Sequence, residues 1–142
     1  MINSVDITSS VPVYVQIENH VRFAIAAGRL KPGDQLPSVR ELSERLGVNP
    51  NTAAKAYRDL EVMGLLFTRR GMGVFVCKDV EEKCREECRR RITERMHEVI
   101  SEAKAAGMNK SDIESIVEKC VLSAAEPYTD MPDDVLDPTK SE

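Results

Sequence analysis

Residues 49–64 have the sequence NPNTAAKAYRDLEVMG, and both ends of this stretch carry helix signals. Asn49 is a favourable N-cap, because its side-chain oxygen can accept hydrogen bonds from backbone N–H groups of the first turn. Pro50 suits the first helical position, where its missing N–H costs nothing, and Gly64 suits the left-handed residue that ends a helix. Apolar residues recur at helical spacing and make one face: Ala53, Ala56, Tyr57, Leu60 and Met63.

The first turn of this predicted helix has the chemistry of a DNA contact. Pro50, Asn51 and Thr52 are small or polar and uncharged, and the cations Lys55 and Arg58 follow them. Short hydrogen-bonding groups backed by positive charge suit a DNA major groove. An ordinary amphipathic helix explains this stretch equally well when it is taken alone, so the flanking sequence has to decide.

A second, shorter helix is predicted just before it. Ser38 and Glu41 have the spacing of a capping box, in which the Ser hydroxyl caps a backbone N–H and the Glu reaches back. This helix should bury Val39, Leu42 and Leu46 and end at Gly47. Two helices joined by a tight turn that contains glycine form a helix-turn-helix signature.

The segments on either side complete the pattern. Residues 12–27 place Tyr14, Ile17, Val21 and Ile25 on one helical face. A turn with Pro and Gly follows, and Gln35-Leu36 fits a very short strand.

Residues 65–68 and 74–77 are rich in β-branched and aromatic residues and predict two strands. Arg69, Arg70 and Gly71 lie at the hairpin tip between these strands. Three helices followed by a hairpin predict a winged helix-turn-helix, with this tip over DNA backbone or the minor groove. Simple solubility is the alternative role for the two arginines.

The chain after Asp79 predicts a long helix and a second helix capped by Asn109. The first has an apolar stripe made of Val80, Cys84, Cys88, Ile92, Met96, Val99, Ala103 and Ala106. The second has an apolar face made of Ile113, Ile116, Val117, Cys120 and Val121. Two helices cannot enclose a core, so we expect a second copy of the chain to cover them; packing back on the N-terminal domain is the alternative.

The predicted fold class is therefore mainly α with a small β-hairpin. Its predicted domains are a DNA-binding winged helix-turn-helix over residues 1–78 and a helical dimerisation region over residues 79–126. Residues 127–142 contain three prolines and five acidic residues and predict an acidic disordered tail.

Charge is unevenly distributed along the chain. Residues 1–78 have ten basic and seven acidic side chains, a net charge of +3, whereas residues 79–142 have ten and seventeen, a net charge of −7. The positive half is the one with the predicted DNA contacts. The sequence shows neither a signal peptide nor a membrane span, which predicts a cytoplasmic protein with its four cysteines reduced.

The chain resembles the GntR family of bacterial transcription regulators. The resemblance covers about residues 12–77 and rests on the order and spacing of Gly28, Pro32-Gly33, Leu36-Pro37-Ser38, Arg40-Glu41-Leu42, Leu46-Gly47-Val48, Thr52, Tyr57, Leu60, Gly64-Leu65 and Gly71-Met72-Gly73. The short C-terminal part is similar to that of the YtrA-like subfamily. This resemblance implies a homodimer, often encoded beside transporter genes, that binds double-stranded operator DNA.

The resemblance also implies specific DNA contacts. Ser38 and Arg40 match residues that hold phosphate, Asn51 and Thr52 match residues that meet base edges or phosphate, and Gly71 matches the wing tip. Pro50 and Ala54 stand where other members often have a base-reading Arg, so Lys55 is expected to take over part of the phosphate binding. The complete predicted DNA-binding set is Ser38, Arg40, Asn49, Pro50, Asn51, Thr52, Lys55, Arg58, Arg69, Arg70 and Gly71.

Other chemistry finds less support in the sequence. Cys84 and Cys88 are one helical turn apart and fit either packing or a thiol- or metal-responsive site, although they lack the CxxC pairs of a zinc site. No nucleophile with an activating base and no phosphate-binding loop appears, so we predict no enzyme activity, catalytic residue, cofactor or metal. We predict a repressor; a winged-helix module that binds protein instead of DNA is the alternative, and an unidentified small-molecule effector is left open.

Overall fold

The computed structural model describes residues 10–123 and 133–138 of the 142-residue chain. The chain forms two compact units, one of Met1–Arg85 with Thr129–Glu142 and one of Glu86–Tyr128. We call the described residues of the first unit the head and residues 86–123 the helical pair. The head ends at Arg85, later than the predicted domain boundary after residue 78, because Val80 and Cys84 are buried in its core.

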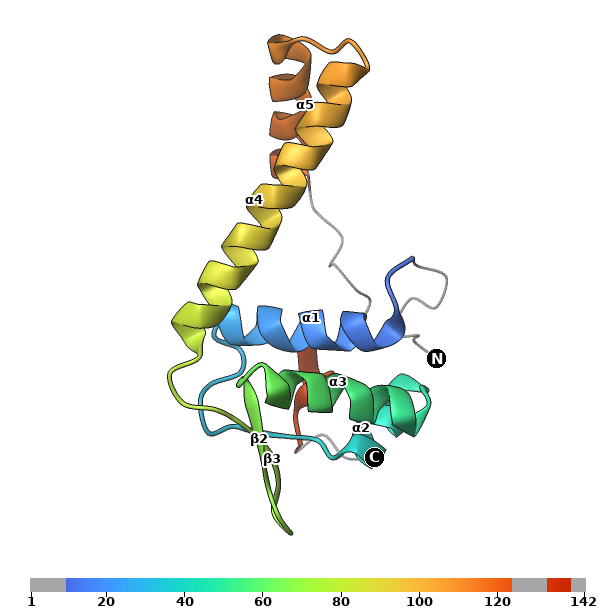
Figure 1. Cartoon of the computed structure of the whole chain (residues 1–142), viewed down its shortest axis with the longest axis vertical. Coiled ribbons are helices and arrows are strands. Elements are labelled where there is room, and N and C mark those ends of the chain that lie inside the picture. The colour runs from blue at the N-terminus through green and yellow to red at the C-terminus, as the bar shows by residue number, and fades with distance from the viewer. Residues whose placement is uncertain (1–9, 124–132, 139–142) are drawn as a thin grey trace. The chain divides into compact units, whose positions relative to one another are not determined.

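The three helices of the head begin and end close to where their caps predict (Figure 1). They are α1 (Val13–Ala26), α2 (Val39–Leu46) and α3 (Pro50–Val62). The capping box of Ser38 and Glu41 starts α2, and Gly47 ends it in a left-handed conformation with φ of 66°. Asn49 caps α3 with Pro50 in its first turn, so this end of the helix-turn-helix forms as predicted.

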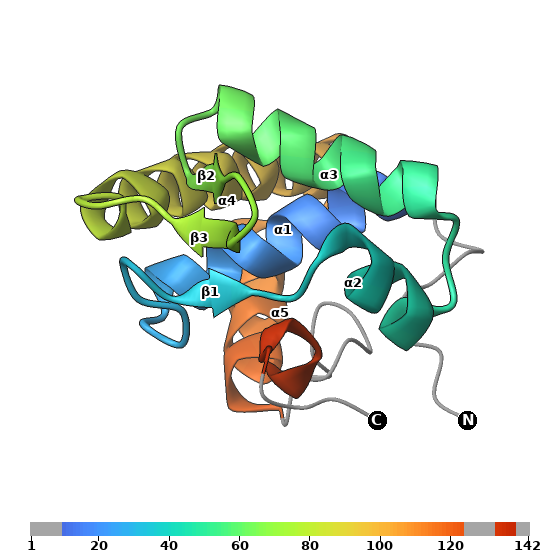
Figure 2. The same ribbon diagram turned by 90° about the horizontal axis from the view of Figure 1, so that it is seen from below.

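The head also contains a three-stranded antiparallel sheet, with the strands in the order β1-β3-β2 (Figure 2). The hairpin strands are β2 (Leu66–Arg69) and β3 (Gly73–Val76). The very short strand β1 (Gln35–Leu36) pairs with the outer side of β3, with Gln35 opposite Phe75. The wing is therefore joined to the segment that leads into α2.

The head has a continuous aliphatic core. Helix α1 contributes Ile17, Val21 and Ile25, each fully buried. The other buried apolar residues come from every element of the head and include Leu36, Leu42, Leu46, Ala53, Ala56, Tyr57, Leu60, Leu66, Val74, Val76, Val80 and Cys84. The predicted apolar faces of the three helices thus meet one another, which confirms the mainly α winged helix-turn-helix.

The helical pair is an antiparallel hairpin of two helices. The helices are α4 (Glu81–Ala105), whose first five residues belong to the head, and α5 (Lys110–Leu122). Gly107 makes the turn with φ of 87°, and the N–H of Met108 donates to the carbonyl of Ala103 at 3.1 Å. Asn109 and Asp112 then form a capping box that starts α5.

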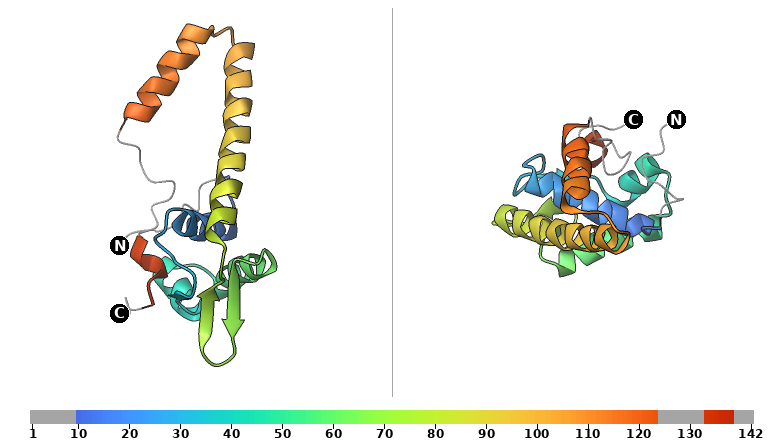
Figure 3. Two further views of the ribbon diagram at one scale, coloured as in Figure 1. Left: turned by 90° about the vertical axis from the view of Figure 1, so that its left-hand side faces the viewer. Right: turned by 90° about the horizontal axis from the view of Figure 1, so that it is seen from above.

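The C-terminal segment differs from the predicted disordered tail. Residues 133–136 form a short 3-10 helix, η1 (Asp133–Leu136), which packs against α2 on the side away from α3 (Figure 3). Val135 and Leu136 are buried in the core of the head, and Arg45 of α2 donates hydrogen bonds to the carbonyls of Val135 and Asp137. The rest of the predicted tail lies outside the described residues, as do residues 1–9.

Candidate nucleic-acid interface

The exposed start of α3 is formed by backbone chemistry local to that turn. The side-chain oxygen of Asn49 accepts from the N–H of Asn51 at 2.8 Å, so the amide of Asn49 serves as the helix cap. Asn51 is exposed and Thr52 is half-buried, while Ala53, Ala56, Tyr57 and Leu60 face the core. Because one face is buried, the polar face of the first turn is presented to solvent, as a major-groove contact requires.

The start of α2 presents a second polar group. The Ser38 hydroxyl accepts from the N–H of Glu41 at 3.0 Å, and the Glu41 carboxylate accepts from the N–H of Ser38 at 3.2 Å. This backbone hydrogen bond, together with the Ser38 hydroxyl, lowers the pKa of Glu41 and keeps the cap charged. Arg40 pairs with Glu44 at 3.2 Å, but its side chain is 88% exposed, so the pair competes weakly with phosphate.

The wing tip places two cations at the end of the hairpin. Arg69, Arg70 and Gly71 are all exposed, and the N–H of Met72 donates to the carbonyl of Arg69 at 2.9 Å to close the turn. Gly71 has φ of 75°, which a glycine adopts without strain. The tip therefore presents positive charge on a defined turn.

Hydrogen bonds connect the wing and α3 to the segment before α2 and to each other. The Gln35 side-chain amide donates to the carbonyl of Met72 at 2.8 Å, and the buried Tyr57 hydroxyl donates to the carbonyl of Pro37 at 2.7 Å. Between β2 and α3, the Thr68 hydroxyl donates to the Glu61 carboxylate at 2.7 Å. The contact between Gln35 and the wing tip was not predicted from the sequence. The local pattern predicts only a short strand at Gln35-Leu36, and nothing near residue 35 indicates its partner Met72.

Known proteins share this arrangement. The model of the family described as "Bacterial regulatory proteins, gntR family" matches residues 13–76. The HTH-type transcriptional repressor YtrA of Bacillus subtilis is 38% identical over 104 residues, which are 73% of this chain and 80% of that protein. This chain belongs to the GntR family.

Solved structures of other GntR proteins agree with this assignment. A GntR family transcriptional regulator from Listeria monocytogenes superposes with a TM-score of 0.64 at 37% identity, over 78% of this chain and 96% of that one. YtrA from Sulfolobus acidocaldarius, a GntR-family transcription factor, gives 0.51 at 35% identity, over 82% and 94%. The chain is thus a transcription regulator with a DNA-binding helix-turn-helix, and its relatives of the YtrA-like subfamily are regulators rather than enzymes.

All eleven DNA contacts predicted for this GntR protein lie in the head. Nine of these residues are exposed, and Thr52 and Lys55 are half-buried. Lys55 has a second set of partners, because its ammonium lies 3.2 Å from the Asp59 carboxylate and 4.5 Å from the centre of the Tyr14 ring. To bind phosphate it would have to leave these contacts, which makes it the weakest member of the predicted set. The contacts themselves stay predictions.

A buried carboxyl lies behind Lys55, between α1 and α3. Burial raises the pKa of Glu18 to about 7, and its hydrogen bond to Asp59 and the charge of Asp59 act in the same direction. The cations Arg22 and Lys55 oppose this shift. The hydrogen bond with Glu18, followed by that with Lys55, lowers the pKa of Asp59. Near pH 7, Glu18 is therefore partly protonated beside an ionised Asp59.

Cys77 and Cys84 have the surroundings of packing residues, whereas Cys88 is half-buried and Cys120 is exposed. Cys84 is 2% exposed in the core of the head, and burial raises the pKa of the Cys77 thiol, which lowers its reactivity. Within residues 10–123 and 133–138, no three His, Cys, Asp or Glu side chains are grouped so as to hold a metal ion. In the same residues, no helix has the length and apolar character needed to cross a bilayer.

Proposed function

We propose that this GntR-family regulator is a repressor that binds a near-palindromic operator as a homodimer. Each subunit inserts the start of α3 into a major groove and lays its wing over backbone or the minor groove, with half-sites about one helical turn apart. The similarity to the Bacillus subtilis repressor YtrA supports the direction of control. A protein that acts on chromosomal operators works in the bacterial cytoplasm.

The observation that carries the homodimer is the bare apolar surface of the helical pair. In the single chain, Ile92, Met96 and Val99 of α4 are 52%, 46% and 61% exposed, and Ile116 and Val121 of α5 are 48% and 76% exposed. Helix α5, described along its whole length, has no buried residue. An apolar surface of this kind marks an interface.

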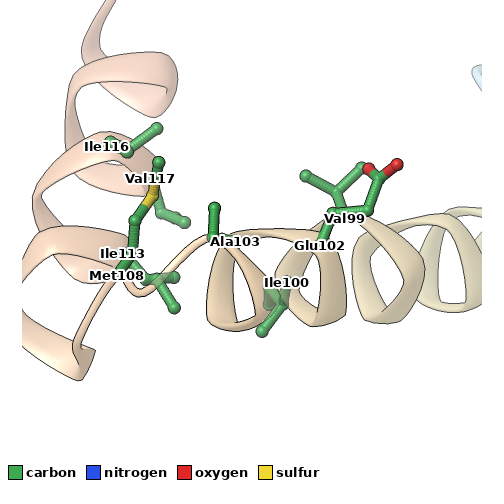
Figure 4. Close-up of a pocket in the computed structure, with 9 residues that line it drawn as sticks. Val99, Ile100, Glu102, Ala103, Met108, Ile113, Ile116 and Val117 are labelled. Carbon is green, nitrogen blue, oxygen red and sulfur yellow. The ribbon is translucent and has the colours of Figure 1, made fainter.

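The two helices also leave a cavity of about 370 Å³ between them (Figure 4). Apart from Glu102, its lining is apolar: Val99, Ile100, Ala103, Ala106, Met108, Ile113, Ile116 and Val117. A second copy of the chain presents the same surface, so a twofold arrangement covers both copies with one set of contacts.

In this proposal, each head makes two kinds of contact with DNA, and they contribute differently to binding. Arg40, Arg69 and Arg70 contact phosphates and release counterions, which supplies affinity with little sequence preference. Asn51 and Thr52 approach base edges closely and supply discrimination. A ligand that binds one relative placement of the heads better than another would shift operator affinity.

The dimer is tested by two matched substitutions on α4. Val99→Glu puts a charge on the exposed apolar surface, and Ser101→Glu puts the same charge two residues away on the polar side of the helix. We expect Val99→Glu to sediment as a monomer and to lose about 100-fold or more in operator affinity, because the two half-sites are no longer linked. Ser101→Glu should behave as the wild type. A dimeric Val99→Glu protein would show that the interface lies elsewhere.

The base-reading role is tested with Asn51→Ala, using the chain's own promoter fragment and a random duplex. We expect binding to the operator to weaken by about 1–3 kcal/mol and binding to random DNA to change little, because only the operator offers the correct base edge. A reporter gene under the same promoter should be derepressed. Equal losses on both duplexes would show that Asn51 reads no base.

A further inference from the structure

Residues 35–38 contact each of the three elements that present the predicted DNA contacts. Gln35 donates to the Met72 carbonyl at the wing tip at 2.8 Å, and the Pro37 carbonyl accepts from Tyr57 of α3 at 2.7 Å. Ser38 caps α2. The wing, α3 and the start of α2 are therefore all held by hydrogen bonds to one short segment of the chain, residues 35–38.

The backbone around Gln35 is fixed by its pairing with β3. It pairs with Phe75 in the sheet, the N–H of Val76 donates to the Asp34 carbonyl at 2.9 Å, and the N–H of Gly33 donates to the Val76 carbonyl at 2.9 Å. The side chain of Gln35 extends from this fixed strand along the sheet towards the wing tip.

Gly73 makes room for this side chain. A Cβ atom at residue 73 would lie 2.5 Å from Nε2 of Gln35, closer than two such atoms approach, and φ of Gly73 is 125°. Gly73 is also the first residue of β3, and its pairing with Arg69 is the rung of the hairpin ladder nearest the tip. The hydrogen bond from Gln35 to Met72 therefore acts just beyond the end of the hairpin ladder, where the ladder itself no longer restrains the tip.

This bond is exposed, so its contribution to folding is small. Its effect is on the orientation of the wing tip, because the tip and its two arginines can bend relative to the paired strands β2 and β3. A fixed tip loses less conformational freedom when it binds a phosphate or the minor groove. Gln35 bonds to Met72, which is not one of the predicted DNA-binding residues, so it acts on DNA binding only through the position of the tip.

We propose that Gln35 is a positioning residue that holds the wing tip at the distance from α3 at which Arg70 and Asn51 engage one DNA site together. The inference rests on the proposed binding of DNA by the wing and α3. It assigns part of operator affinity to a side chain outside the helix-turn-helix and outside the hairpin.

The test is a pair of double-mutant cycles on the full-length protein, with salt titrations of operator binding. Gln35→Met keeps the length of the side chain and removes its donor; Arg70→Ala removes the wing cation; Arg40→Ala removes a cation on α2 that Gln35 does not contact. We expect Gln35→Met alone to weaken operator binding about 3- to 10-fold and to make the salt dependence shallower. Thermal unfolding and circular dichroism should match the wild type.

The two cycles should differ. In the Arg70→Ala protein, Gln35→Met should cost almost nothing further, because the group that it positions is gone, whereas in the Arg40→Ala protein its cost should be unchanged. If Gln35→Met costs the same in the Arg70→Ala protein, Gln35 does not act through the wing and the proposal is wrong. If Arg70→Ala itself leaves affinity and salt dependence unchanged, the proposed wing contact fails first and the positioning role fails with it.

Discussion

The head and the helical pair have similar apolar patterns and opposite burial. In α1, Ile17, Val21 and Ile25 recur every four residues and are all 0% exposed. In α4, Ile92, Met96 and Val99 recur at spacings of four and three, and each is at least 46% exposed within the single chain. The periodicity of a helix predicts which face is apolar, but it carries no information about what covers that face.

The difference follows from how many elements converge. In the head, three helices, a sheet, the first turn of α4 and η1 enclose one core. In the helical pair, the two helices approach each other near their turn, around Ala103 and Ile113, and leave most of their apolar surface outside. A single layer of two helices has no second layer to bury it, which is why we propose that a second copy of the chain covers it.

Two leucines of the C-terminal half test this contrast with the largest expected effect. Leu136 is 1% exposed in the head, and Leu122 is 75% exposed at the end of α5. Leu136→Ala should lower the free energy of unfolding by about 2–5 kcal/mol, measured by urea titration, because it leaves a cavity in the core. Leu122→Ala should change it by less than about 0.5 kcal/mol. Equal effects would mean that η1 is not part of the core of the head.

A buried carboxyl is the exception inside the head and predicts a pH dependence. Because the pKa of Glu18 is raised from 4.5 to about 7, the folded protein retains a proton that the unfolded chain has lost in this range. The stability contributed by the protonated group is complete below pH 4.5 and is lost as the pH rises to about 7. We expect the free energy of unfolding to fall by an amount on the order of 1–3 kcal/mol across this window.

Glu18→Gln checks the assignment of that pH dependence. Glutamine keeps the size and polarity of the side chain but does not titrate, so this part of the pH dependence should disappear and the variant should be the more stable protein at pH 8. Val99→Glu offers a contrast, because a carboxyl on the exposed surface of the pair should titrate near its ordinary pKa in the monomer. A Glu18→Gln protein with the pH profile of the wild type would assign the dependence to another group.

The two cysteines of α4 give the smallest and sharpest comparison, because they lie one turn apart on either side of the boundary. Cys84 is buried in the head, and Cys88 is half-buried in the pair. Cys84→Ala should cost about 1–2 kcal/mol at any protein concentration, through lost core packing. The cost of Cys88→Ala should depend on protein concentration, since in the proposed dimer the second copy covers this side chain. A metal that purifies with the wild type and is absent from the double variant would instead support a thiol site.

Much of the fold follows from signals that act within four residues. The cap at Ser38, the Asn49-Pro50 start of α3, the left-handed Gly47 and the box at Asn109 all form as their local chemistry predicts. These signals are reliable because each acts on backbone groups of the same turn: Ser38, Asn49 and Asn109 through a side-chain oxygen, and Gly47 through its left-handed backbone. No other part of the chain is needed to make these bonds. The predicted polar face at the start of α3 is exposed for the same reason.

Composition predicted disorder for residues 127–142, and residues 133–136 depart from that prediction by forming η1. Prolines and acidic residues disfavour a core, yet Val135 and Leu136 are two apolar residues that α2 and Arg45 can hold. Two residues are too few to produce a periodic pattern. The contact forms because the head can bury these two side chains in its core. The sequence around residue 136 gives no indication of this.

The sequence by itself determined the helices, their caps, the hairpin and the family, since these depend on neighbours along the chain and on spacing. Only the tertiary structure decided that β1 joins β3, that Gln35 holds the wing tip, that Tyr57 binds Pro37 and that Glu18 lies beside Asp59. Each of these contacts closes a long loop, and its partners have no shared local signature. They meet because the whole core places them together, and the energy of each contact depends on the burial and geometry found only there.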